Sequence, residues 1–178
     1  MKRALIVVDY QKDFVDGALG FPKAPTLAKG IRTKIGQYRN RQDAVLFTFD
    51  THDDDYLKTR EGRHLPVPHC IKGTPGFELD EAIKDVRKDT DHVFYKPCFG
   101  SLALADHLKE AQYDHIELVG LVTNICVLAN AVIAQAALPE ADIIVDAGLC
   151  ASFDETLHDK ALDIMRGLFI TVKEEAQP

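Results

Sequence analysis

Three side chains that can support nucleophilic chemistry lie just past apolar runs of this chain. Asp9 follows Ala-Leu-Ile-Val-Val, Lys96 follows His-Val-Phe-Tyr, and Cys126 comes a few residues after Ile-Glu-Leu-Val-Gly-Leu. If these runs are parallel strands of one sheet, their carboxyl ends share an edge, and the three side chains converge there. An acid, a cation and a thiol in one crevice predict nucleophilic catalysis.

Cys126 is the candidate nucleophile because a helical pattern begins directly after it. A thiol in the first turn of a helix feels the positive end of the helix dipole, which favours the thiolate. The alternative is a buried, inert cysteine, the commoner state of a free thiol. Cys98, two residues after Lys96, is the rival nucleophile, whereas Cys70 and Cys150 are assigned to packing.

Each of the two charged candidates has a plain structural alternative. In the crevice, Lys96 would stabilise a thiolate and a developing oxyanion; otherwise it is a surface lysine that closes a strand. Asp9 would carry a proton between the thiol and a leaving group, or else cap the turn that follows it. Asp13, four residues further on, is interpreted as structural.

A second group of polar residues has the composition of a metal site. Asp50 and His52 are two residues apart at a strand end, where alternate side chains share a face, and His69 follows after a loop. One carboxylate and two imidazoles with open positions suit zinc, iron or manganese. The alternative is that both histidines are hydrogen-bonded loop residues that bind no ion.

The elements that would position these residues alternate between strand and helix patterns. Short runs rich in Val, Ile and Phe predict strands, and the segments between several of them have helical spacing. This alternation predicts an α/β fold with three α/β/α layers, Rossmann-like, around a mostly parallel six-stranded sheet. The predicted strands are residues 3–8, 44–49, 92–95, 115–121, 142–145 and 168–172.

Two further segments have readable patterns. Ser152 followed by Glu155 resembles a capping box and predicts the start of the last helix, which Gly167 would end. Residues 50–77 have no clear periodicity, and long irregular segments of this kind in compact domains are often functional.

Composition limits the possible partners and compartment. A length of 178 residues fits one domain, residues 1–178, and the apolar runs are too short to span a bilayer. A formal net charge of −7 argues against nucleic acid and anionic membranes as partners. Four widely spaced cysteines without a C-x-x-C pair predict reduced thiols in the cytoplasm.

Taken together, these residues resemble the isochorismatase-like cysteine hydrolases, and within them the nicotinamidases, also called pyrazinamidases. The resemblance runs from about residue 3 to 172, and its motifs occur in the family order. The motifs are Asp9 in Asp-x-Gln-x-Asp-Phe, Asp50-x-His52, Pro-His-Cys-Ile-Lys-Gly-Thr-Pro-Gly at 68–76, Lys96, and Gly-Leu-Val-Thr-Asn-Ile-Cys-Val at 120–127.

The resemblance implies a cytoplasmic homo-oligomer that hydrolyses nicotinamide to nicotinate and ammonia through a cysteine thioester, in NAD salvage. It implies a divalent metal, zinc first and iron or manganese as alternatives, and a non-proline cis peptide that helps to hold the oxyanion. The site residues that it implies are Asp9, Lys96 and Cys126 as the triad; Asp50, His52 and His69 as metal ligands, with Glu61 or His64 as a fourth; Phe14 as substrate wall; and Val122–Thr123 as the cis peptide.

Departures from the family pattern leave two other functions open. Asn124 replaces the usual Asp of the Thr-Asp-x-Cys motif, Pro-Cys-Phe-Gly-Ser follows Lys96 in place of the usual Tyr-Ser-Ala/Gly-Phe stretch, and the chain has no Trp. One alternative is a metal-free hydrolase of carbamoyl, ureido or other small amides from the same superfamily. The other is a non-catalytic binding protein, since a fold does not by itself give a function.

Overall fold

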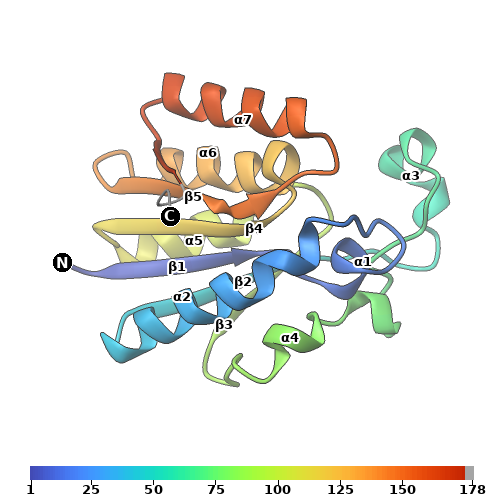
Figure 1. Cartoon of the computed structure of the whole chain (residues 1–178), viewed down its shortest axis with the longest axis horizontal. Helices are drawn as coiled ribbons and strands as arrows, with labels where there is room; N and C mark the ends of the chain where they lie inside the picture. Colours follow the sequence, from blue (N-terminus) through green and yellow to red (C-terminus); the bar gives the residue numbers. More distant parts are fainter. Residues whose placement is uncertain (175–178) are drawn as a thin grey trace.

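A single parallel sheet forms the centre of the computed structural model, which describes residues 1–174 (Figure 1). Its strand order is β3-β2-β1-β4-β5-β6, and every pairing between neighbouring strands is parallel. The prediction of an α/β fold with six strands is confirmed. The strands are β1 (Arg3–Val8), β2 (Ala44–Asp50), β3 (His92–Lys96), β4 (His115–Leu121), β5 (Asp142–Ala151) and β6 (Thr171–Lys173).

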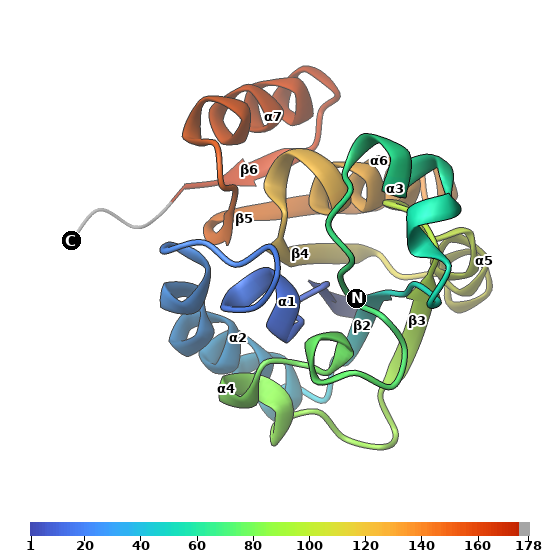
Figure 2. The same ribbon diagram turned by 90° about the vertical axis from the view of Figure 1, so that its right-hand side faces the viewer.

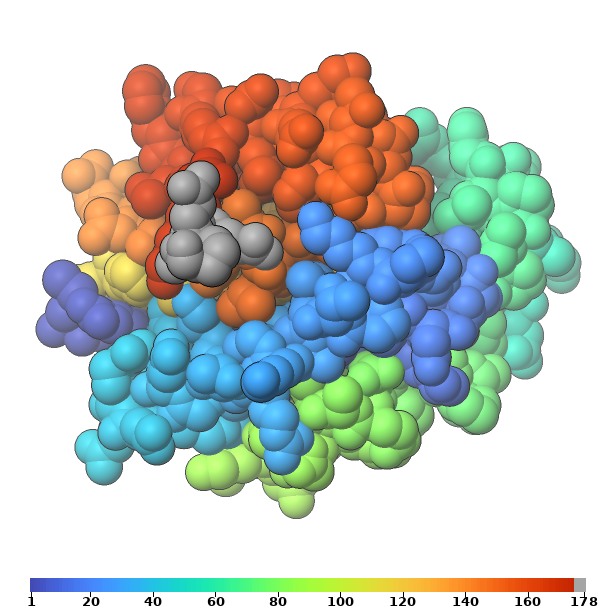
Figure 3. Space-filling model, in the orientation of Figure 1, coloured from blue at the N-terminus to red at the C-terminus, as the bar shows by residue number. Residues whose placement is uncertain are grey.

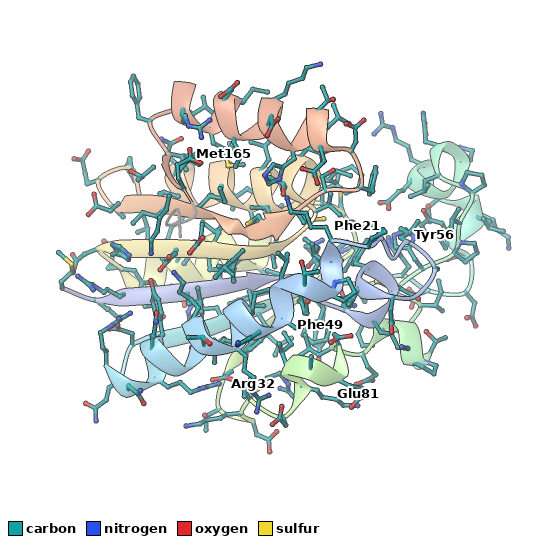
Figure 4. All side chains as sticks on the ribbon, viewed as in Figure 1. Phe21, Arg32, Phe49, Tyr56, Glu81 and Met165 are labelled. Atoms are coloured by element: carbon teal, nitrogen blue, oxygen red, sulfur yellow. The ribbon has the colours of Figure 1, made fainter. Side chains whose placement is uncertain are left out.

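Helices cover both faces of this sheet (Figure 1). Side chains of β1 alternate between the two faces, so that Ile6 packs in one hydrophobic core and Val7 in the other. One core includes side chains from α5 (Leu102–Ala111), α6 (Leu128–Ala137) and α7 (Glu155–Gly167), and Met165 of α7 points towards the sheet (Figure 4). The other includes side chains from α1 (Lys12–Val15), α2 (Ala28–Asn40) and α4 (Glu81–Lys84).

The last strand begins later than the sequence predicted. Residues 168–170 do not start β6 but close α7, because the backbone N–H of Ile170 donates to the carbonyl of Met165 at 3.0 Å and Phe169 has a φ of 63°. The preceding strand is longer than predicted, since β5 continues to Ala151 after a register shift in its pairing with β4.

The start of α7 also differs from the predicted capping box. Asp154 is the N-cap, and its carboxylate accepts from the backbone N–H of Leu157 at 3.0 Å. The Ser152 hydroxyl accepts instead from the N–H of Asp154 at 3.0 Å. The predicted capping box of Ser152 and Glu155 is therefore wrong, because β5 extends to Ala151 and α7 begins two residues later than that pattern requires.

A long excursion, residues 51–80, crosses the carboxyl edge of the sheet, and we call it the α3 segment. It contains η2 (Tyr56–Lys58), α3 (Arg60–His64) and η3 (Pro75–Phe77), three single turns in the region predicted to be irregular. Figure 2 looks onto this edge, and Figure 3 shows the segment projecting at one end of the molecule. The Gln11 side chain attaches the α3 segment to the end of β2, since its Nε2 donates to the carbonyls of both Asp50 and Phe77.

No helix among residues 1–174 combines the length and the apolar character that crossing a membrane requires.

Candidate active site

The ammonium group of Lys96 contacts both other candidate catalytic side chains, Asp9 and Cys126. Lys96 ends β3 and is 1% exposed, so it is not a surface lysine. Its Nζ lies 2.6 Å from Asp9 Oδ2, 3.2 Å from Asp50 Oδ1 and 3.4 Å from Cys126 Sγ. The carboxyl ends of β1, β3 and β4 therefore bring an acid, a cation and a thiol together. Cys98 presents its carbonyl oxygen to Lys96, at 3.2 Å, while its side chain is exposed.

One carboxylate oxygen of Asp9, Oδ1, accepts a hydrogen bond, and the other, Oδ2, does not. The Thr48 hydroxyl donates to Asp9 Oδ1 at 2.6 Å. Asp9 Oδ2 contacts the Lys96 ammonium as an ion pair but has no hydrogen bond of good geometry, although it is buried. A φ of 44° at Asp9 turns the chain sharply after β1. A buried oxygen with spare capacity to accept a proton is what a base for the thiol requires.

Cys126 lies in a wide turn between β4 and α6. Residues Thr123–Val127 form one π-helical turn, η4, in which the carbonyl of Val122 accepts from the N–H groups of Ile125 and Val127. The cis peptide precedes this turn, between Leu121 and Val122. The implied position at Val122–Thr123 is wrong by one residue, because β4 ends at Leu121 and the chain leaves the sheet there.

Burial dominates the protonation of the cysteine. It raises the pKa of Cys126 well above its usual value; the Lys96 charge lowers that pKa, and the Asp9 charge raises it. Burial thus opposes the thiolate form that a helix start was expected to favour. Burial also raises the pKa of Asp9, against the opposing effect of Lys96. Burial alone would lower the pKa of Lys96, but the charges of Asp9 and Cys126 raise it, so the ammonium stays charged.

Four possible metal ligands gather beside this cluster. Asp50, His52, Glu61 and His69 each offer a ligand atom, and these atoms lie within 4.8 Å of one another. Asp50 Oδ2 is 3.1 Å from His52 Nε2 and 3.3 Å from His69 Nε2. Glu61 Oε1 is 3.7 Å and 3.6 Å from the same two nitrogens. In a tetrahedral site with bonds of about 2.1 Å, neighbouring ligands are roughly 3.4 Å apart.

The donor set fits a divalent ion chemically as well. The Nδ1 of His69 pairs with the carbonyl of Val67 at 2.8 Å, which leaves its Nε2 for the ion. Burial and the nearby Asp50 raise the pKa of Glu61, because two facing carboxylates repel each other when both are charged. His64 does not join this group, since its Nδ1 pairs with the carbonyl of Arg60 and its side chain is exposed. Glu61 is therefore the better candidate for a fourth ligand.

Tyr56 was not singled out by the sequence, yet it packs on both imidazoles. Its ring centroid is 4.7 Å from that of His52 and 5.0 Å from that of His69 (Figure 4 labels Tyr56). Its hydroxyl donates to the carbonyl of Leu65 at 2.9 Å, which fastens the end of α3. Nothing in the spacing of the residues pointed to this contact.

A small apolar chamber of about 80 Å³ opens onto the thiol and the candidate metal ligands. A wider cavity of about 620 Å³ adjoins it and shares four of its lining residues. Phe99 follows β3 and Phe153 follows β5, so the strand-end rule used for Asp9 could have found them. The chamber is lined by Phe14, Leu19, Leu65, Phe99, Val122, Ile125 and Phe153, with Asp50, Glu61, His69 and Cys126.

This chain is similar to known proteins in sequence and in fold over nearly its whole length. Residues 3–177 match the model of the isochorismatase domain. An isochorismatase family protein of Bacillus subtilis is 34% identical over 91% of this chain and 93% of its own. The crystal structure of a nicotinamidase/pyrazinamidase from Bacillus subtilis superposes with a TM-score of 0.88 at 31% identity, covering 98% and 100% of the two chains. The crystal structure of an N-carbamoylsarcosine amidase from Thermoplasma acidophilum superposes with a TM-score of 0.81 at 28% identity, covering 100% of this chain and 99% of that chain.

Proposed function

Because this chain belongs to the isochorismatase family, whose members here include nicotinamidases, we propose that it is an amidohydrolase that converts nicotinamide to nicotinate and ammonia. The observation that carries the proposal is the contact of Lys96 Nζ with both Asp9 and Cys126 at the mouth of an apolar chamber. A thiol, a base and a fixed cation are the groups that covalent amide hydrolysis requires.

In the proposed complex the aromatic ring occupies the chamber and the carboxamide carbon faces Cys126. Phe14, Phe99 and Phe153 provide apolar contact area, which a flat ring can use without losing hydrogen bonds. The chain lacks the Trp that the family often places here, and Phe99 and Phe153 are the aromatic side chains at hand.

The proposed reaction proceeds through a thioester. Asp9 Oδ2 accepts the Cys126 proton, and the sulfur attacks the carboxamide carbon to form a C–S bond. Backbone N–H groups around Cys126 donate to the resulting oxyanion. When the C–N bond breaks, Asp9 returns the proton to the departing ammonia. Water then adds to the thioester, its proton passing through Asp9, and nicotinate leaves as the thiol re-forms.

Lys96 acts throughout as a fixed positive charge. It stays protonated, lowers the pKa of Cys126 and holds Asp9 at 2.6 Å. Once Asp9 has taken the proton, the same charge faces the thiolate and stabilises the ion that attacks.

A divalent ion is part of the proposal, with Asp50, His52, Glu61 and His69 as its ligands. When bound, it would supply a Lewis-acid position that can hold the ring nitrogen of the substrate. Zinc suits two imidazoles and two carboxylates, and iron or manganese suits them as well. His69 and Glu61 line the chamber, which supports a metal ion next to the proposed substrate position.

A carbamoyl or ureido compound is the second candidate substrate. The observation that favours it is the N-carbamoylsarcosine amidase likeness, at 28% identity over the full chain. Such a hydrolase would use the same three catalytic side chains without a metal.

The proposal is tested by measuring ammonia release from nicotinamide, pyrazinamide, ureido acids and other small amides, together with elemental analysis of the protein. We expect nicotinamide and pyrazinamide to react and a divalent ion to co-purify or to be taken up from solution. In the double variant H52A/H69A the ion and most nicotinamide turnover should be lost, while Cys126 keeps its reactivity towards iodoacetamide. Turnover of ureido acids by a protein that binds no ion would favour the second candidate.

A further inference from the structure

A histidine far from the predicted machinery contacts the turn that carries Cys126. His158 lies in the first half of α7, and its Nδ1 is 2.9 Å from the hydroxyl oxygen of Thr123. His158 is 6% exposed and Thr123 is fully buried. The contact joins residues that are 35 positions apart in the chain. Figure 1 shows α7 starting at the same end of the molecule as the carboxyl edge of the sheet.

This contact fixes the start of the turn, and a second side chain fixes its end. Thr123 is the first residue of η4. At the other end, Asn130 Nδ2 donates to the carbonyl of Cys126 at 2.8 Å, and its Oδ1 accepts from the N–H of Ser101 at 3.0 Å. Cys126 is thus held between two buried anchors, one on α6 and one on α7. A π-helical turn is wider than an α-helical turn, and such turns recur at functional sites.

The role of His158 is that of a hydrogen-bonding group and not of a charge. Burial lowers the pKa of His158, and the positive charge of Lys23 lowers it too. The imidazole is therefore neutral at neutral pH, when a single ring N–H is present. Its effect on Cys126 must pass through the position of Thr123 and the backbone that follows.

We propose that His158 is a positioning residue for the nucleophile, which it aligns by holding Thr123 and hence the turn in which Cys126 lies. This inference rests on the proposed role of Cys126. A small displacement of a reacting group can cost about 100-fold in rate. Removing the contact should therefore lower the rate of the chemical step, while the metal ligands and the chamber walls formed by Phe14 and Phe99, which lie on other segments, remain.

The first test compares H158L, which lacks ring nitrogens, with H158N, whose short amide can still reach the Thr123 hydroxyl. We expect kcat for nicotinamide to fall about 10- to 100-fold in H158L with little change in KM, and H158N to recover most of it. H107L is the matched control, because His107 also faces a hydroxyl, that of Tyr113 at 3.4 Å, but on α5. Its kcat should equal that of the wild type.

The second test is a double-mutant cycle with T123V, which removes the hydroxyl and keeps the shape. If His158 acts through Thr123, H158L/T123V should lose no more kcat than either single change. Losses that multiply would overturn the proposal, as would an H158L protein that melts earlier but keeps wild-type kcat. If H158L does not fold, T123V alone must still reduce kcat.

Iodoacetamide distinguishes failure of this inference from failure of the proposed function. The rate of alkylation of Cys126, measured in a C98A background because Cys98 is exposed, should fall in H158L in parallel with kcat. If the wild type hydrolyses no amide, the proposed function fails, while the alkylation rates still decide whether His158 aligns the thiol. Equal alkylation rates in wild type and H158L would contradict the alignment.

Discussion

Two buried lysines each lie between two carboxylates, and only one of the two clusters also contains a thiol. Lys96, at the carboxyl edge of the sheet, contacts Asp9 and Asp50. Lys34, on α2, lies 2.7 Å from both Glu117 of β4 and Asp146 of β5. The charges match, so charge alone does not explain why one cluster would react.

The difference lies in which polar atoms have partners. The Tyr38 hydroxyl donates to Glu117 at 2.7 Å, and the pKa of Glu117 is lowered, because hydrogen bonds from Lys34 and Tyr38 outweigh burial. Asp9 keeps one buried oxygen without a hydrogen bond, and its pKa is raised by burial. The buried carboxylates of the Lys34 cluster have hydrogen-bond partners, and we expect this cluster to be structural. The Lys96 cluster has a buried carboxylate with a raised pKa and a thiol that lines an apolar chamber, which is what we expect of a reaction centre. A cavity also adjoins the Lys34 cluster, but it is lined mainly by charged and polar side chains and by no thiol.

The largest effect on activity is expected from removing the proposed nucleophile, Cys126, which contacts the Lys96 cluster and not the Lys34 cluster. C126A should lower kcat by at least about 10⁴-fold, because the attacking atom is gone. A small apolar side chain can replace a buried thiol, so the melting temperature should stay near that of the wild type. C98A is the control and should keep turnover. Retained turnover in C126A with loss in C98A would make Cys98 the nucleophile.

Exchanging either lysine for methionine compares the clusters directly. K96M should lower kcat about 100-fold or more, since loss of the cation raises the pKa of Cys126 further. Alkylation of Cys126 as a function of pH measures that change. K34M should leave kcat per folded molecule unchanged. An unaltered alkylation profile in K96M would remove Lys96 from the mechanism.

K34M should lower the stability of the folded protein and not its activity. Glu117 and Asp146 would remain buried without their main cation, so the free energy of unfolding should fall by about 3 kcal/mol. Urea denaturation monitored by circular dichroism measures it. Lys173, 3.7 Å from Glu117, is too exposed to replace the lost charge fully. A stability within experimental error of the wild type would mean that the Lys34 cluster contributes nothing to the fold.

The smallest expected effect concerns pH. The pKa of Glu117 is lowered from its usual 4.5, so its stabilising contribution is complete above that value and is lost as the pH falls through the lowered pKa. E117Q should lose about 1.5 kcal/mol at neutral pH. The gap between E117Q and wild type should narrow at acid pH. A gap that stays constant from neutral to acid pH would contradict the lowered pKa.

Strand ends were the part of the site that the sequence predicted well. The apolar runs before Asp9, Lys96 and Cys126 become strands β1, β3 and β4, and parallel strands bring their ends to one edge whatever the loops do. Phe99 and Phe153 follow from the same rule but were not singled out, because an aromatic residue after a strand has no chemical signature of its own.

Contacts made by loops and turns were not predictable in the same way. The choice of Glu61 over His64 depends on the rotation of the single turn α3, since both lie on it three residues apart. The cis peptide lies at Leu121–Val122, one residue before the position that the family resemblance implied, and the residue types around it do not specify which bond is cis. His158 faces Thr123 only through the packing of α7, which helical spacing does not specify.

The thioester at Cys126 is tested most directly by partitioning with hydroxylamine. An acyl-enzyme formed from nicotinamide or from a nicotinate ester is the same species, so hydroxylamine and water should divide it in one fixed ratio. We predict equal ratios of hydroxamate to nicotinate from the amide and the ester, and no hydroxamate formation by C126A. Ratios that change with the leaving group, or hydroxamate formed by C126A at the wild-type rate, would contradict the account.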